Sequence, residues 1–157
     1  MTAAAVESPL RRLIGAWEFE ASRLDGQFLG RGRATFKWIE NGRFVLERAE
    51  DVPHEDTDPE WAEHSPMPVT AIIGLDDSTG EQSQLYTDAR GVFRIYRMRL
   101  TDAAWTMWRD APGFNQRFTA DITDGGDTIR GQWQTSEDGE EWTPDFDLVY
   151  RRVGVAP

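Results

Sequence analysis

Turns rich in glycine divide the chain after Gly15 into short segments in which apolar and polar residues alternate. A period of two is typical of strands with one buried face, and Asn-Gly or Asp-Gly between two such segments favours a tight hairpin. One hairpin after another predicts an all-β antiparallel meander of about ten strands. A flat sheet of that size would leave unpaired edges and a bare apolar face, so we expect closure into an up-and-down antiparallel barrel. The turn signals are Asp25-Gly26, Asn41-Gly42, Ser78-Thr79-Gly80, Arg90-Gly91, Pro112-Gly113, Gly125-Gly126 and Asp138-Gly139.

The turns also predict which side chains share a face, because turn length sets the strand register. The turn at 111–114 reads as type II and places Arg109 opposite Gln116, and the last turn is predicted to align Thr135 with Trp142. Each hairpin agrees with the next, which indicates one inward face. The inward residues are Trp17, Phe19, Ala21, Ala34, Phe36, Trp38, Val45, Glu47, Ala49, Val69, Ala71, Ile73, Leu75, Gln84, Tyr86, Asp88, Arg94, Tyr96, Met98, Leu100, Trp105, Met107, Arg109, Gln116, Phe118, Ile122, Ile129, Trp133, Trp142, Phe146, Leu148 and Tyr150. The outward residues include Arg97, Arg99, Thr106, Arg117, Thr119, Arg130, Gln132, Gln134, Asp145 and Asp147, and Trp108 is expected to form a surface cation–π pair with Arg117.

Two segments depart from the strand pattern. Ser8 can cap a short helix that Pro9 begins and Gly15 ends, and we expect this helix to plug one end of the barrel. The connection from Pro53 to Pro68 is the one long loop, and Asp58 can cap a second short helix within it. Long loops in compact domains are often lids, so this connection is predicted to be lid-like.

A length of 157 residues with 39% hydrophobic residues fits a single domain, residues 1–157, with a real core. No apolar run approaches the ~20 residues that a membrane helix needs. The segment Met1–Val6 has neither a basic region nor a long apolar stretch, so we expect no signal peptide.

Charge and cysteine content exclude several classes of partner. A formal net charge of −11 argues against nucleic acid, whose phosphates require a basic face, and against anionic membranes. The chain has no cysteine, which excludes disulfides and thiolate chemistry and favours the reducing cytoplasm. The sequence leaves a homodimer open.

Several residues carry a resemblance to known barrels. Gly15-Ala16-Trp17, behind a short helix, is similar to the Gly-x-Trp opening of the calycin superfamily, which includes lipocalins, fatty-acid-binding proteins and nitrobindins. The chain also resembles, over nearly its whole length, a bacterial family common in actinobacteria with a lipocalin-like barrel. That resemblance implies a fold and no activity, because the family has no settled function. The matching segments are Asp88-Ala89-Arg90-Gly91-Val92, 108–118, Gly131-Gln132-Trp133, Ser136-Glu137-Asp138-Gly139, Trp142 and 145–150.

Histidines limit the cofactor chemistry that we expect. Nitrobindins hold haem through a histidine on a late strand, whereas His54 and His64, the two histidines here, both lie in the long connection. We therefore expect no haem and no other cofactor. A Ser-His-Asp catalytic triad inside the barrel would need a histidine there, and neither histidine is predicted to lie inside the barrel. The acidic residues around the histidines match no metal motif, so we expect a solvated loop and no metal; they are Glu55, Asp56, Asp58, Glu60 and Glu63.

Polar residues interrupt the inward face, and buried arginines need an anion. In one interpretation Arg94 and Arg109 clamp the carboxylate or phosphate of a ligand while Tyr96 donates a hydrogen bond. In the other, Asp88 or Glu47 neutralises the arginines internally and water fills the remaining space. The sequence leaves both open.

A barrel of about ten strands is usually wider than side chains can fill, so a cavity is expected. The predicted ligand-binding residues are Arg94, Tyr96, Arg109, Gln116, Tyr86, Glu47, Trp38, Trp105, Phe118 and Trp133. The first functional hypothesis is intracellular binding of a small amphipathic or aromatic ligand with an anionic group. The second is an isomerase or cyclase that uses Glu47, Asp88 or Tyr96 as its acid–base group. The third is an interaction module with a filled barrel.

Overall fold

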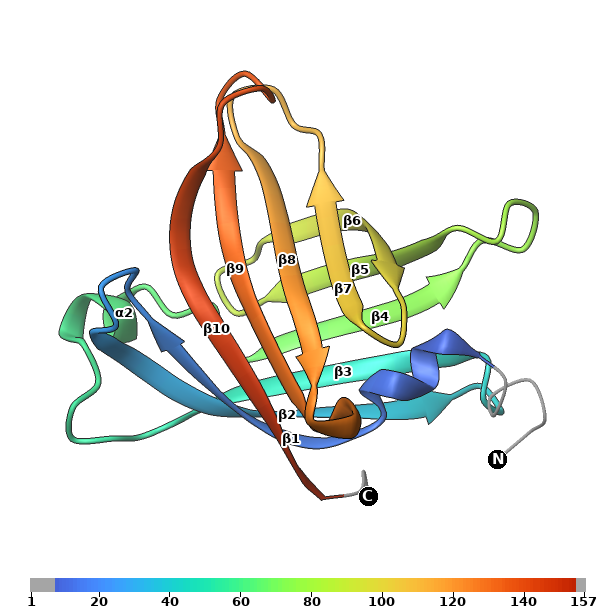
Figure 1. Cartoon of the computed structure of the whole chain (residues 1–157), viewed down its shortest axis with the longest axis horizontal. Coiled ribbons are helices and arrows are strands. Elements are labelled where there is room, and N and C mark those ends of the chain that lie inside the picture. Colours follow the sequence, from blue (N-terminus) through green and yellow to red (C-terminus); the bar gives the residue numbers. More distant parts are fainter. Residues whose placement is uncertain (1–7, 155–157) are drawn as a thin grey trace.

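The computed structural model describes residues 8–154, and the segment for which no signal peptide is predicted lies outside them. Ten antiparallel strands form a closed barrel in the order β1-β10-β9-β8-β7-β6-β5-β4-β3-β2 (Figure 1). Each strand pairs with its neighbours in the chain, and the first strand pairs with the last. The predicted up-and-down barrel is confirmed.

The strands alternate with tight turns except at the long connection, which contains a helix. Their bounds are β1 (Gly15–Ser22), β2 (Phe28–Ile39), β3 (Phe44–Val52), β4 (Val69–Leu75), β5 (Gln82–Asp88), β6 (Phe93–Leu100), β7 (Ala104–Arg109), β8 (Asn115–Thr123), β9 (Thr128–Ser136) and β10 (Thr143–Gly154). The helices are the 3-10 helix η1 (Pro9–Leu13), α2 (Pro59–Glu63) and the 3-10 turn η2 (Asp124–Gly126). None of the helices in residues 8–154 has the length and hydrophobicity required to span a bilayer.

The barrel has a closed end and an open end. In Figure 1 strands β7–β10 run steeply across the view, β2–β5 run nearly at right angles behind them, and η1 and η2 lie at the lower end. Helix α2 lies at the opposite end, beside the start of β2. The Asp58 backbone N–H donates to the Leu29 carbonyl of β2 over 2.8 Å, which fixes the connection to the barrel rim.

The predicted register is confirmed across β6–β9. Leu100 pairs with Trp105, and Phe118 pairs with both Met107 and Trp133. The turn at 111–114 has the geometry expected for type II, with Gly113 at φ 89°. Period-two alternation and turn chemistry therefore set the face of most side chains in this part of the barrel.

The predicted pairing of Thr135 with Trp142 is wrong by one residue. Thr135 pairs with Thr143, and the ladder resumes at Phe146 after a β-bulge in β10. The bulge inserts one extra residue, Asp145, so Phe146 still faces inward as predicted. Trp142 faces outward, and its ring lies 4.2 Å from the Arg117 guanidinium carbon. That ring, rather than Trp108, forms the cation–π contact with Arg117.

Leu75 is a second departure from the predicted inner face. It is the last residue of β4 and pairs with Gln82, where the β4–β5 hairpin extends past the barrel body (Figure 1). Leu75 is accordingly 42% exposed, although Val69, Ala71 and Ile73 on the same strand are buried. Alternation predicts the side of the sheet on which a side chain lies. Whether that side chain is buried depends on whether another part of the barrel covers it.

The closed end is built as predicted around the first helix. The Ser8 hydroxyl accepts a hydrogen bond from the Leu10 N–H, and both Leu10 and Leu13 are fully buried. The Trp17 indole N–H donates to the Leu13 carbonyl over 2.8 Å. Trp17 thus joins η1 to β1 and closes the barrel floor.

Inward-facing glycines make room for large aromatic rings. A Cβ on Gly131 would lie 2.4 Å from the Phe118 ring and 2.9 Å from the Ala120 Cβ, and a Cβ on Gly32 would lie 2.2 Å from Phe19. Only glycine allows such close ring-to-backbone packing. The rings can therefore lie flat against the wall.

We expect Gly131→Ala to lower the free energy of unfolding by about 1–3 kcal/mol, because the added methyl overpacks the Phe118 ring. Urea denaturation measures the change. Gly154→Ala, at the end of β10 where a Cβ would have no neighbour within 4 Å, is the matched control and should change stability by less than about 0.5 kcal/mol. Equal effects of the two substitutions would contradict the packing argument.

Candidate functional site

A cavity of about 460 Å³ lies inside the barrel and opens toward α2. All ten strands contribute to its lining, as do residues of the long connection. The barrel interior is therefore not filled by its own side chains. Eight of the ten predicted ligand-binding residues line it: Glu47, Tyr86, Arg94, Tyr96, Trp105, Gln116, Phe118 and Trp133.

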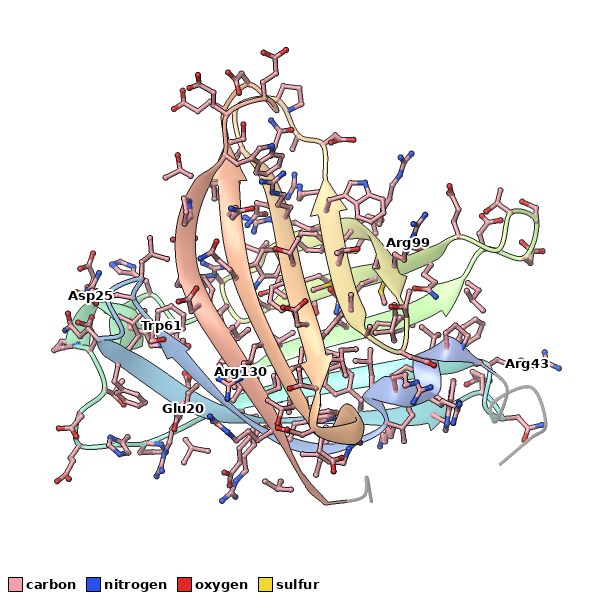
Figure 2. The ribbon with its side chains drawn as sticks, in the orientation of Figure 1. Glu20, Asp25, Arg43, Trp61, Arg99 and Arg130 are labelled. Atoms are coloured by element: carbon pink, nitrogen blue, oxygen red, sulfur yellow. The ribbon has the colours of Figure 1, made fainter. Side chains whose placement is uncertain are left out.

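The long connection forms one wall of the cavity mouth. Trp61 on α2 points toward the barrel, whereas Glu20, Arg99 and Arg130 lie on its outer face (Figure 2). The Trp61 ring packs edge-on against Phe146, with centroids 5.1 Å apart. The Ala89 N–H in the β5–β6 turn donates to a carbonyl of the connection over 3.1 Å. The predicted lid-like segment thus lies across the opening.

Arg94 and Tyr96, neighbours on the inward face of β6, are held by one amide. The Gln116 side-chain carbonyl accepts from the Arg94 guanidinium over 3.1 Å and from the Tyr96 hydroxyl over 3.0 Å. The ring of Phe114, an exposed residue, lies 5.4 Å from the Arg94 guanidinium carbon. Within residues 8–154 no carboxylate lies within 4.0 Å of Arg94.

Asp88 is one of the predicted neutralising partners of Arg94, but in the structure its carboxylate is hydrogen-bonded to another arginine. Its carboxylate accepts from Arg90 over 2.7 Å and from the Tyr86 hydroxyl over 2.9 Å. The Asp88 side chain is fully buried by these contacts. Arg90 therefore balances Asp88, and the charge of Arg94 is left facing the cavity with a neutral amide as its partner.

Glu47 lies deep in the cavity and is paired with no arginine among the described residues. The residue is 6% exposed, and the Gln84 amide donates to its carboxylate over a long 3.5 Å. Burial raises the pKa of Glu47 to about 7, because an ionised carboxylate loses its hydration there. This side chain can therefore gain or lose a proton near neutral pH.

Arg109 and Trp38 do not border the cavity. Arg109 is the last residue of β7, next to the turn at 111–114. Burial raises the pKa of Tyr96, and the charges of nearby arginines, Arg109 among them, oppose that rise. Trp38 pairs with Val45 beside the β2–β3 turn, at the closed end. Both face inward by parity, but they lie at strand ends outside the cavity.

Neither histidine occupies a late strand. The His54 ring packs on Phe28 with centroids 4.9 Å apart, and His64 follows α2 at the cavity mouth. Among residues 8–154 no three His, Asp or Glu side chains converge as a metal site. Strands β8–β10 carry no histidine.

Several lining residues were absent from the predicted site. Tyr150 is predicted to face inward, but strand pairing does not predict which residues lie across the lumen from it. Trp61, Arg90 and Phe114 come from the connection and from turns, where alternation carries no information. Asp145 was predicted outward, and the bulge turns it to the cavity mouth. A proline at 144, which removes a ladder N–H, is the one sequence signal for that bulge.

Comparison with known proteins bears on the fold. No family model and no curated protein matches the chain. The crystal structure of Rv2717c from M. tuberculosis is similar, with a TM-score of 0.61 and 13% sequence identity over 98% of this chain and 99% of that chain. At this identity the likeness shows a shared fold alone, and the strand order shows that fold to be an all-β, closed ten-stranded antiparallel barrel.

Proposed function

We propose that this protein binds a small amphipathic or aromatic ligand with an anionic group inside its barrel, as a lipocalin-like member of the calycin superfamily. An intracellular, cytoplasmic setting is part of the proposal and is supported by the cysteine-free sequence. Its partner is a small molecule rather than a nucleic acid or membrane, consistent with the net charge of −11.

The observation that carries the proposal is that most hydrogen-bond donors of the Arg94 guanidinium have no partner in the described chain. This guanidinium has five N–H donors and cannot be deprotonated in a protein, yet its one hydrogen-bond partner in the described chain is the Gln116 carbonyl. A guanidinium with free donors in a partly enclosed cavity favours a carboxylate or phosphate, which it can hold through two bonds. Gln116 orients both this donor and the Tyr96 hydroxyl toward the same space.

The rest of the cavity suits an apolar or aromatic body. Tyr96 and Trp133 meet with ring centroids 5.5 Å apart, and Phe118 meets Trp133 at 5.2 Å. Rings packed in this way form a rigid apolar wall with few rotamers to lose on binding. An apolar pocket with a few placed polar groups is typical of small-molecule sites.

We expect decanoate to bind wild-type protein and Arg94→Met to weaken that binding about 10–100-fold, the value of a hydrogen bond to a charged group. Calorimetric titration measures both. Arg97→Met, which removes an exposed arginine from the outer face of the same strand, is the matched control and should bind as wild type. Decanol, with the same chain and no charge, should bind at least about tenfold more weakly. An Arg94→Met variant with wild-type affinity would refute the anion site.

Native mass spectrometry of freshly purified protein tests the proposal without choosing a ligand. A retained small molecule would appear as added mass, and its release on denaturation would identify its class. The Arg94→Met protein should lose that mass while the Arg97→Met protein keeps it. Retention by both variants would indicate a ligand held without the guanidinium.

A second candidate function is acid–base catalysis in the same cavity, of the isomerase or cyclase type. The observation that favours it is Glu47, a carboxyl that lines the cavity and exchanges its proton near neutral pH. Turnover of a bound compound, followed by mass spectrometry and abolished by Glu47→Gln, would support catalysis. Binding that leaves the compound unchanged over hours would favour the carrier.

A further inference from the structure

All three tyrosines of the chain line the cavity, and two of them use their hydroxyls within the protein. Tyr86 donates to Asp88 and Tyr96 donates to Gln116. Among the side-chain hydrogen bonds of residues 8–154, the hydroxyls of Tyr86 and Tyr96 take part and the Tyr150 hydroxyl does not. The Tyr150 hydroxyl, like the buried indole N–H of the lining residue Trp105, is thus a donor left for something that the described protein does not supply.

Tyr150 lies at the deep end of the cavity and its ring is fixed. It pairs with Phe19 of β1, and its ring contacts Phe19, Trp17 and Trp105 at centroid distances of 5.7, 6.5 and 6.3 Å. Trp17 belongs to the closed end, where it is bonded to η1. A ring held on three sides cannot swing its hydroxyl toward another partner.

Glu47 brings a second polar group to the same end. It pairs with Phe36 of β2, which in turn pairs with Gly15 at the start of β1, so Glu47 also lies toward η1. Its carboxylate is close enough to act on the Tyr150 hydroxyl, and burial together with this charge raises the pKa of Tyr150. The hydroxyl therefore keeps its proton and stays a donor.

We propose that the deep end of the cavity, where Glu47, Gln84 and Tyr150 converge, is a second polar subsite that hydrogen-bonds an uncharged oxygen of the ligand. The ligand would then be an amphipathic acid that carries a hydroxyl or carbonyl group at the end opposite its carboxylate. This inference rests on the proposed function, since it takes Arg94 as the site of the anionic end.

The charges at the two ends set the orientation. Glu47 is an acidic group with no arginine beside it, so a ligand carboxylate near it would meet a like charge or a buried neutral acid. A hydroxyl or carbonyl oxygen can accept from Tyr150, and a hydroxyl can also donate to the Glu47 carboxylate. Arg94, with free donors at the mouth, takes the anion instead.

The register gives the distance between the two ends. Arg94 pairs with Tyr86, Tyr86 with Ala71, and Ala71 with Glu47, so the two polar ends lie three strands apart along one row. At about 4.8 Å per strand this is at most about 14 Å along the wall, a length that a chain of about ten carbons can span. Ala71, small and buried, leaves room between them.

Calorimetric titration with decanoate and 10-hydroxydecanoate tests the subsite, because the probes differ only at the end distant from the carboxylate. We expect wild-type protein to prefer 10-hydroxydecanoate about tenfold, since decanoate would bury the Tyr150 hydroxyl against a methyl group. Tyr150→Phe, which removes only the hydroxyl, should reduce the preference to about twofold or less. Arg94→Met should weaken both probes and preserve their ratio.

The outcomes separate this inference from the function on which it rests. Equal wild-type affinities, with both probes weakened by Arg94→Met, would overturn the subsite and leave the anion site standing. A preference that persists in Tyr150→Phe would overturn the role of that hydroxyl. Failure of both probes to bind, or insensitivity to Arg94→Met, would overturn the proposed function and this inference with it. If Tyr150→Phe does not fold, the wild-type ratio decides alone.

Discussion

Replacing Glu47 by glutamine should raise the free energy of unfolding by about 3 kcal/mol at pH 8 and change it little at pH 4. The pKa of Glu47 is about 7 in the fold against the ordinary value of 4.5. Below pH 4.5 the carboxyl is neutral in both the folded and the unfolded chain and carries no penalty. As pH rises from 4.5 to 7 the unfolded chain gains by ionising while the buried group resists, so stability falls and then stays low. Glutamine removes that cost.

Thermal unfolding followed by circular dichroism at pH 4, 6 and 8 measures the effect. For a chain of this length, 3 kcal/mol corresponds to a rise in Tm of about 6–12 °C at pH 8. Glu50→Gln, which removes an exposed carboxylate from the outer face of the same strand, is the control and should shift Tm much less than Glu47→Gln does at pH 8. A Glu47→Gln shift that does not depend on pH would mean that the carboxyl is hydrated or ion-paired in solution.

Glu47 also illustrates which features of the candidate site could be predicted from the sequence. Its inward direction follows from the Asn41-Gly42 hairpin and is confirmed, because Glu47 pairs with the buried Phe36. Turn residues and period-two alternation are local properties, so a single sequence contains them. The consequence of that direction depends on what lies across the lumen, where both Glu47 and Tyr150 line the cavity although no strand pairing joins them. Local pattern therefore predicts the direction of a side chain better than its partner.

Turns and strand ends account for most of the differences between the predicted and the observed site. Arg90, at the tip of a turn, takes the Asp88 carboxylate that the sequence offered to Arg94. The bulge at Asp145 reverses the parity of Trp142 while leaving Phe146 inward. Arg109, inward by register, ends its strand outside the cavity. In each case the alternation of apolar and polar residues ends at the residue concerned. The geometry of the turn, bulge or strand end then determines where its side chain lies.

Replacing Arg152 by alanine should lower the free energy of unfolding by about 3 kcal/mol, because this one side chain joins the last strand to the closed end. Its guanidinium donates to the Arg12 carbonyl over 2.9 Å, to the Ile14 carbonyl, and to the Asp127 carboxylate over 2.9 Å. The guanidinium carbon also lies 4.2 Å from the centre of the Trp17 ring.

The magnitude follows from the groups that alanine would leave behind. Carbonyls that lose a charged donor at a partly buried position each cost about 1–3 kcal/mol, and a shielded cation–π contact contributes about 1 kcal/mol, with the sum reduced because water enters the vacated space. Arg152→Lys should recover only part of the loss, since an ammonium cannot donate along several fixed directions while lying flat on an indole.

Urea denaturation of Arg152→Ala, Arg152→Lys and Arg151→Ala separates this explanation from a general effect of charge. Arg151 is the exposed neighbour on the opposite face of β10, and its removal should change stability by less than about 0.5 kcal/mol. Hydrogen exchange should also accelerate in residues 9–15 of the Arg152→Ala protein, because η1 loses its bonds to β10. Since Trp17 and Tyr150 pack together, loosening of this end should reach the cavity and weaken decanoate binding in step with stability. If Arg152→Ala and Arg151→Ala unfold at the same urea concentration, the barrel floor is held by η1 packing alone.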